Sequence, residues 1–70
     1  MFELIEIKNY DTRHSYGTDW HTDYIIKTDE DLNIQELIKK LQELGQQPCG
    51  NCKLKKVEGK NEIILETITY

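Results

Sequence analysis

Two cysteines and two histidines are the residues of this 70-residue chain best suited to metal chemistry. Cys49 and Cys52 form a Cys-x2-Cys pair, which places two thiolates on one tight turn, and the intervening Gly50 relieves backbone strain. A structural zinc ion needs four ligands, and His14 and His21 are the only histidines in the sequence. Cys49, Cys52, His14 and His21 are therefore the candidate ligands of a structural zinc ion, and no other cofactor is expected.

Three other uses of the two cysteines stay open. Two Cys-x2-Cys pairs can share one metal ion across a dimer axis, or the thiols can be free and without a role. A redox or disulfide role is less favoured, because Cys49 and Cys52 follow the end of a predicted helix. The helix dipole lowers a thiol pKa at a helix N-terminus and has the opposite sign at a C-terminus.

Aromatic and charged side chains are concentrated between residues 10 and 24, a stretch that holds the only Trp and the only Arg. Trp, Tyr and Arg are enriched at the energetic centres of protein interfaces, and they also stack on bases or contact phosphates. The alternative is that some rings close the open end of a small core, while Arg13 pairs only with Asp11 or Asp19. The predicted binding site consists of Tyr10, Arg13, His14, Tyr16, Trp20, His21 and Tyr24.

A helix from Asn33 to Gly45 is predicted by several independent signals. Asn33 and Glu36 have the spacing of a capping box, and Leu32 and Leu37 that of a hydrophobic staple. Gly45 suits a left-handed C-cap, and the proline that follows prevents the helix from resuming. One apolar stripe runs along it, made of Ile34, Leu37, Ile38, Leu41 and Leu44.

Four strands complete the predicted fold. Phe2 to Lys8 and His21 to Thr28 are joined by a polar hairpin tip over residues 9–20, and Cys52 to Val57 is joined to Glu62 to Tyr70 by a turn over residues 58–61. The ββαββ order indicates one α+β domain over residues 1–70, a small antiparallel-rich sheet with one helix packed on one face.

Both faces of the predicted sheet carry apolar residues, and one helix can cover only one of them. Ile5 and Ile7 are expected to share the uncovered face with either Ile63 and Leu65 or Ile64 and Ile68. An apolar face of this kind is typical of an interface, so we expect a homodimer.

The predicted topology also brings distant residues together. The strand from His21 spans about 23 Å, and the helix returns about 17 Å across the sheet. The loop with Cys49 and Cys52 is therefore expected near the hairpin tip that carries His14 and His21.

Charge and hydropathy narrow the class of partner. The chain has 9 Lys+Arg against 13 Asp+Glu, a net charge of −4, which disfavours generic nucleic-acid binding. A local basic patch is best explained as a solubilised hairpin edge, made of Lys53, Lys55, Lys56 and Lys60. No apolar run approaches the ~18 residues of a membrane span, and the N-terminus does not resemble a signal peptide. We expect a cytoplasmic protein with reduced thiols and no membrane contact.

No glycine-rich phosphate loop and no Ser/His/Asp arrangement is present, so we expect a binding protein and not an enzyme. The chain has no alanine and one arginine against eight lysines, which is typical of an AT-rich genome. A tiny, acidic, oligomeric chain of this composition with an aromatic loop resembles in character the accessory proteins of bacteriophages. The resemblance implies a phage or mobile-element accessory protein with a counter-defence role. It would inhibit a host protein, or act as a sponge for a signalling nucleotide, through the hairpin over residues 10–24. The alternative is an intracellular protein-interaction module stabilised by zinc.

Overall fold

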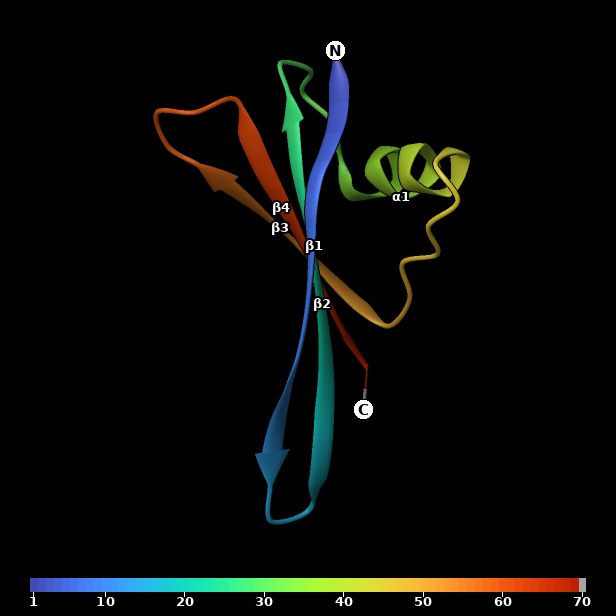
Figure 1. Cartoon of the computed structure of the whole chain (residues 1–70), viewed down its shortest axis with the longest axis vertical. Helices are drawn as coiled ribbons and strands as arrows, with labels where there is room; N and C mark the ends of the chain where they lie inside the picture. Colours follow the sequence, from blue (N-terminus) through green and yellow to red (C-terminus); the bar gives the residue numbers. More distant parts are fainter. Residues whose placement is uncertain (70) are drawn as a thin grey trace.

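The computed structural model describes residues 1–69 and contains one four-stranded sheet and one helix in the order ββαββ (Figure 1). The strands are antiparallel in the spatial order β1-β2-β4-β3, which confirms the predicted α+β class. Tyr70, the last residue of the predicted fourth strand, lies outside the described residues. Within residues 1–69, no helix is long and apolar enough to cross a membrane. The elements are β1 (Phe2–His14), β2 (Gly17–Thr28), α1 (Ile34–Glu43), β3 (Asn51–Val57) and β4 (Glu62–Thr69).

Helix α1 begins and ends where its capping residues require. The Glu36 N–H donates to Asn33 Oδ1 (2.8 Å), and the Asn33 N–H donates to Glu36 Oε1 (3.1 Å), which completes the capping box. At the other end Gly45 has φ +85°, and its N–H donates to the Gln42 carbonyl. The Gln46 N–H reaches the Leu41 carbonyl (2.9 Å), so the helix closes with a Schellman motif.

The core lies between α1 and the face of the sheet that α1 covers. Leu37 and Leu41 on the helix, Ile26 on β2 and Leu65 on β4 are fully buried. Leu32, the first residue of the predicted staple, is 8% exposed and belongs to the same cluster. Burying side chains of this size contributes about 1.5–3 kcal/mol each, so this layer holds the helix on the sheet.

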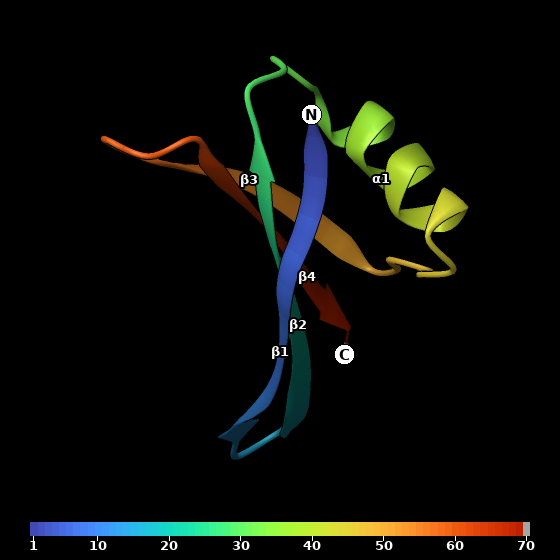
Figure 2. The same cartoon turned by 45° about the horizontal axis from the view of Figure 1, so that its top comes forward.

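The first hairpin is far longer than its sequence suggested. Residues 9–20 are predicted to form the hairpin tip, but β1 and β2 pair residue for residue down to His14 and Gly17, so the turn itself is residues 15 and 16. Polar side chains join the strands: the Thr22 hydroxyl donates to Asn9 Oδ1 (2.9 Å). Residue types that favour turns predict a turn region when they are considered one segment at a time. The side chains that bond to them lie on the opposite strand, so the spacing within one segment does not indicate the pairing. We call residues 10–21 the arm; it extends away from the end that carries α1 (Figures 1 and 2).

A β-bulge changes the faces of β1. Leu4 pairs with Ile26 and Glu6 with Ile25, so Ile5 is an extra residue. Beyond it the alternation is shifted, and Ile7 pairs with Tyr24 on the helix-covered face. The expectation that Ile7 lies on the uncovered face was therefore wrong.

The other half of that expectation is resolved on β4. Ile63 and Leu65 are buried under the helix, and Ile64 and Ile68 alternate to the uncovered face, which we call the open face. There Ile64 pairs with Ile25 of β2.

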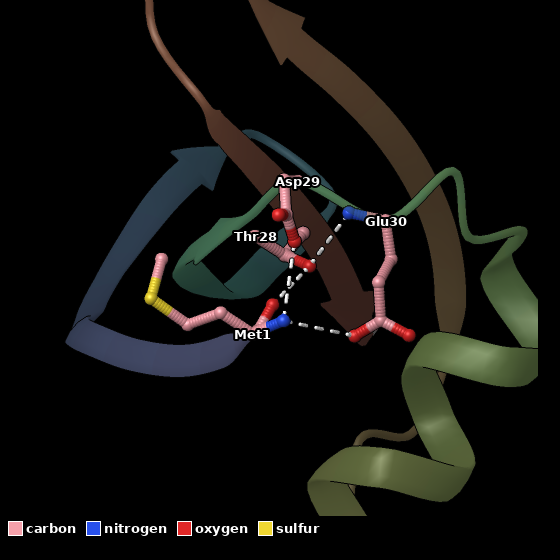
Figure 3. A network of polar contacts seen from close by, with 4 residues as sticks. All are labelled: Met1, Thr28, Asp29 and Glu30. Carbon is pink, nitrogen blue, oxygen red and sulfur yellow. Dashed lines mark hydrogen bonds and ion pairs between the residues drawn. The ribbon is translucent and has the colours of Figure 1, made fainter.

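The start of β1 is tied to the end of β2 (Figure 3). The Thr28 hydroxyl donates to the Met1 carbonyl (2.6 Å) and accepts the Glu30 N–H (3.1 Å). The Met1 ammonium lies 3.1 Å from Asp29 Oδ1, and this hydrogen bond lowers the pKa of the Asp29 carboxyl. These contacts fix the end of the sheet opposite the arm.

Candidate functional site

The open face of the arm carries a ladder of bonded side chains. The Tyr10 ring stacks on His21 with centroids 4.6 Å apart and planes 4° from parallel. The Tyr10 hydroxyl donates to Asp23 Oδ2 (3.1 Å), and His21 Nε2 lies 2.9 Å from the Thr12 hydroxyl. Desolvation and then the Asp23 carboxylate raise the pKa of Tyr10.

The tip of the arm is ordered by a second stack. His14 Nε2 lies 2.7 Å from Asp19 Oδ2, and its ring stacks on Tyr16 at 4.8 Å with parallel planes. Tyr16 is 82% exposed. The turn presents this ring outward while the imidazole behind it is held in place.

The other face of the arm carries Trp20, Asp11 and Arg13. Trp20 pairs with Asp11 across the hairpin and is 59% exposed. Arg13 Nε donates to Asp11 Oδ2 (3.2 Å), one of the two pairings expected for it. An exposed pair of this kind is worth about 0–1 kcal/mol, so the guanidinium is easily recruited by a partner.

Tyr24 does not belong to the exposed set. It is 6% exposed and lies in the core cluster, because it alternates to the helix-covered face of β2. Burial raises the pKa of Tyr24, and the thiols Cys49 and Cys52 add to that rise. For this ring the core interpretation is right, and the other six predicted residues lie in the arm.

Asp23 is a residue that sequence reasoning missed. Its Oδ2 accepts the Tyr10 hydroxyl, whereas its Oδ1 is buried and has no hydrogen-bond partner among residues 1–69. Across the open face, the strand registers set Lys8, Asp23, Glu66 and Lys53 in one row, so two carboxylates are neighbours between two lysines. Only the register of four strands reveals this row, and no local spacing carries it.

The cysteines and histidines are not brought together. Cys52 pairs with Thr67, which pairs with Thr22, on the helix-covered face, whereas His21 alternates to the open face. His14 is at the arm tip, beyond the last pair of β2 with β4 at Trp20. The arm is longer than expected, so the chain returning from α1 reaches its base and not its tip.

The juxtaposition that a single-chain Cys2His2 site needs is therefore missing. Residues 1–69 contain no group of three or more His, Cys, Asp or Glu side chains placed to hold a metal ion. Both thiols are free; burial, followed by the neighbouring Cys49, raises the pKa of Cys52. Gly50 between them has φ +84°, and a Cβ there would lie 2.3 Å from the Ile68 carbonyl oxygen.

Two hollows of the described surface lie away from the arm. One is formed by residues 28–31 together with the β3–β4 turn, and another by the segment from Gln42 to Cys49 that follows α1. Neither is lined by arm residues, and the arm itself protrudes from the sheet as a ribbon (Figure 1). Its charged groups include Asp11, Asp19 and Arg13.

Comparison with known proteins gives no relative: no family model, no curated protein and no solved structure matches this chain.

Proposed function

We propose that this chain is a non-enzymatic binding protein that recognises another protein through the arm, with Trp20 and Tyr16 as its principal contacts. The observation that carries the proposal is the exposure of these two rings, 59% and 82%, on a protruding ribbon. Rings of this type supply most of the binding energy in protein interfaces.

The side-chain bonds of the arm support the proposal, because they prepare the surface for binding. Tyr10 and His21 are stacked, and His14 is held between Asp19 and Tyr16. Ordering a long side chain on binding costs about 0.5–1.5 kcal/mol. Side chains that are already ordered avoid much of this cost.

The shape of the arm favours a protein partner over a nucleotide. Sites for small molecules are concave and bury most of the ligand surface, whereas the arm is a protruding ribbon whose rings are spread over two faces and the tip. A partner with a cleft and a basic rim suits the ribbon, given Asp11 and Asp19 and the net charge of −4. In the phage setting indicated by the composition, that partner is a host protein and binding inhibits it.

The proposal is tested by capture followed by measured affinity. Tagged chain is used to recover partners from the lysate of a low-GC bacterium, and a purified partner is titrated in a calorimeter. We expect Trp20→Ala and Tyr16→Ala each to weaken binding by about 2 kcal/mol or more, as hot-spot residues do. Leu44→Ala is the matched control, since Leu44 is 52% exposed at the end of α1.

Two results would overturn the proposal. One is a partner whose affinity falls with Leu44→Ala and not with the arm variants. The other is heat on titration with cyclic or ADP-ribose-type nucleotides and none with any protein, which would assign the arm to nucleotide sequestration.

The zinc-stabilised interaction module has a separate test. In this alternative, two Cys49/Cys52 pairs from two chains hold the ion, since the histidines lie elsewhere. Metal analysis of unchelated protein would give about one zinc per two chains, and a ratio near zero would remove the alternative.

A further inference from the structure

The two edges of the sheet differ in how well they are protected. β3 is a seven-residue edge strand with Lys53, Lys55 and Lys56. β1 is a 13-residue edge strand with a strand neighbour, β2, on one side only. Short length and lysines keep edges from pairing with other chains. β1 carries one lysine, Lys8, and a bulge near its start, whereas the shorter β3 carries three lysines, so β1 is the less protected edge over residues 6–14. Three exposed large apolar side chains lie on β1, namely Ile5, Ile7 and Tyr10.

The outer part of the arm has no third strand in the described structure. Within residues 1–69, β4 pairs with β2 only as far as Trp20, so residues 12–14 and 17–19 form a ribbon of two strands. A two-stranded hairpin alone in water is marginally stable, and a third strand or an apolar layer is usually needed. The outer edge of β1 is where a third strand can be added.

We propose that a second copy of this chain adds its β1 antiparallel to β1, which joins two sheets into one of eight strands. The pairing uses residues 6–14, the regular stretch after the bulge at Leu4/Glu6. A closed dimer has a two-fold axis, and for antiparallel strands this axis stands perpendicular to the sheet, so one residue faces its own copy. Tyr10 is the middle of the stretch and lies on the axis.

The absence of like-charge pairs supports this register. With Tyr10 on the axis, Glu6 faces the second copy's His14, and Lys8 faces its Thr12; no like charges are opposed. Moving the axis to Lys8 opposes two lysines. On β3, an axis at Leu54 opposes Lys53 to Lys55 twice, so that edge is unsuited to the same pairing.

The edge is also a better interface than the open face. At the centre of the open face Asp23 and Glu66 are cross-strand neighbours. Two copies stacked face to face there would bury four carboxylates together with the lysines beside them, and removing so many charges from water is costly. Edge pairing leaves Trp20 on β2 and Tyr16 at the tip uncovered, so it goes beyond the proposed function and does not depend on it.

Cysteine cross-linking tests both the edge and the register. In a Cys49→Ser/Cys52→Ser background, single cysteines replace Tyr10, Lys8 or Thr12, and dimers are quantified on non-reducing gels after mild oxidation. Residues on the axis have Cα atoms about 4.5–5.5 Å apart, within the range of a disulfide. The other two positions are about 13 Å from their own copies. We expect Tyr10→Cys to cross-link at least about tenfold faster than Lys8→Cys and Thr12→Cys.

Light scattering provides the second readout without altering Tyr10. We expect a mass near twice 8.3 kDa for the full chain. Thr12→Lys places a lysine against the second copy's Lys8 on both sides of the axis and should weaken the dimer about tenfold. Ser15→Lys is the matched control, because Ser15 lies in the turn between β1 and β2, outside residues 6–14.

The outcomes separate cleanly. A monomer at high concentration with no preferred cross-link, or cross-linking that peaks on β3 at Lys55→Cys, would overturn the proposal. Fast cross-linking at Ile7→Cys with little at Tyr10→Cys would overturn the register. Circular dichroism confirms that each variant is folded before its result is counted.

Discussion

At the scale of single residues, Asp23 is the side chain whose surroundings conflict most. One carboxylate oxygen accepts the Tyr10 hydroxyl, and the other is buried without a partner beside Glu66. A buried carboxylate oxygen that has given up its hydrogen bonds to water without gaining others lowers the stability of the fold. Like charges directly opposite each other on a sheet also destabilise it.

We therefore expect Asp23→Asn to stabilise the protein by about 0.5–1 kcal/mol. The amide keeps an acceptor for Tyr10, removes the charge and supplies N–H donors. Asp23→Ala, which also removes the acceptor, should destabilise it. Urea unfolding measures both, and an Asn variant less stable than the Ala variant would show that the charge itself is required.

The raised pKa of Tyr10 predicts how the free energy of unfolding changes at alkaline pH. Its folded-state pKa is raised above the ordinary 10.0, first by desolvation and then by Asp23. A raised pKa means that the folded chain holds the phenol proton more tightly, so this stabilisation is full below about pH 10 and is lost as pH rises through the folded pKa. We expect Tyr10→Phe to make unfolding midpoints fall less steeply above pH 10. Tyr16→Phe, at an 82% exposed ring, is the control and should keep the wild-type slope.

At the scale of elements, local and non-local signals gave different results. The ends of α1 are set by side chains within a few residues, Asn33 with Glu36 and Gly45 with Gln42, so the sequence predicted them closely. The arm was predicted as a loop because its stabilising partners lie across the hairpin, as Thr22 does for Asn9.

Substitutions in the turn before β3 test how closely the backbone of that turn approaches β4. Gly50 and Gly59 both have positive φ, +84° and +76°, but only at Gly50 would a Cβ meet backbone, 2.3 Å from the Ile68 carbonyl oxygen. Gly59→Ala should cost about 1 kcal/mol from backbone strain alone. Gly50→Ala should cost about 3 kcal/mol or more, because β3 must also move away from β4. Equal losses in thermal unfolding would contradict the close approach.

At the scale of the whole molecule, the fold class was readable from the sequence and the site was readable only in part. The ββαββ order and the single covered face followed from the spacing of apolar residues and from the turn-forming and capping residues between the elements. Six of the seven predicted site residues lie in the arm, and Tyr24 lies in the core. The zinc cluster depended on how far the chain returns after α1, and the extra length of the hairpin separated Cys52 from His14.

The buried layer between α1 and the sheet supplies a large part of the protein's free energy of unfolding. A 70-residue domain is expected to have a free energy of unfolding of about 4–10 kcal/mol. Leu37 is fully buried between α1 and the sheet, so Leu37→Ala should cost about 2–5 kcal/mol. Leu44→Ala, at a 52% exposed position, should cost far less in the same denaturant series. Similar losses would mean that α1 does not cover the core as described.

Hydrogen–deuterium exchange of the chain with and without its purified partner tests directly whether the arm is the binding surface. We expect slowed exchange at the amides of the arm, residues 10–21, centred on Tyr16 and Trp20, and little change over Ile34–Glu43 of α1. Protection confined to α1, with the arm unchanged, would contradict this expectation.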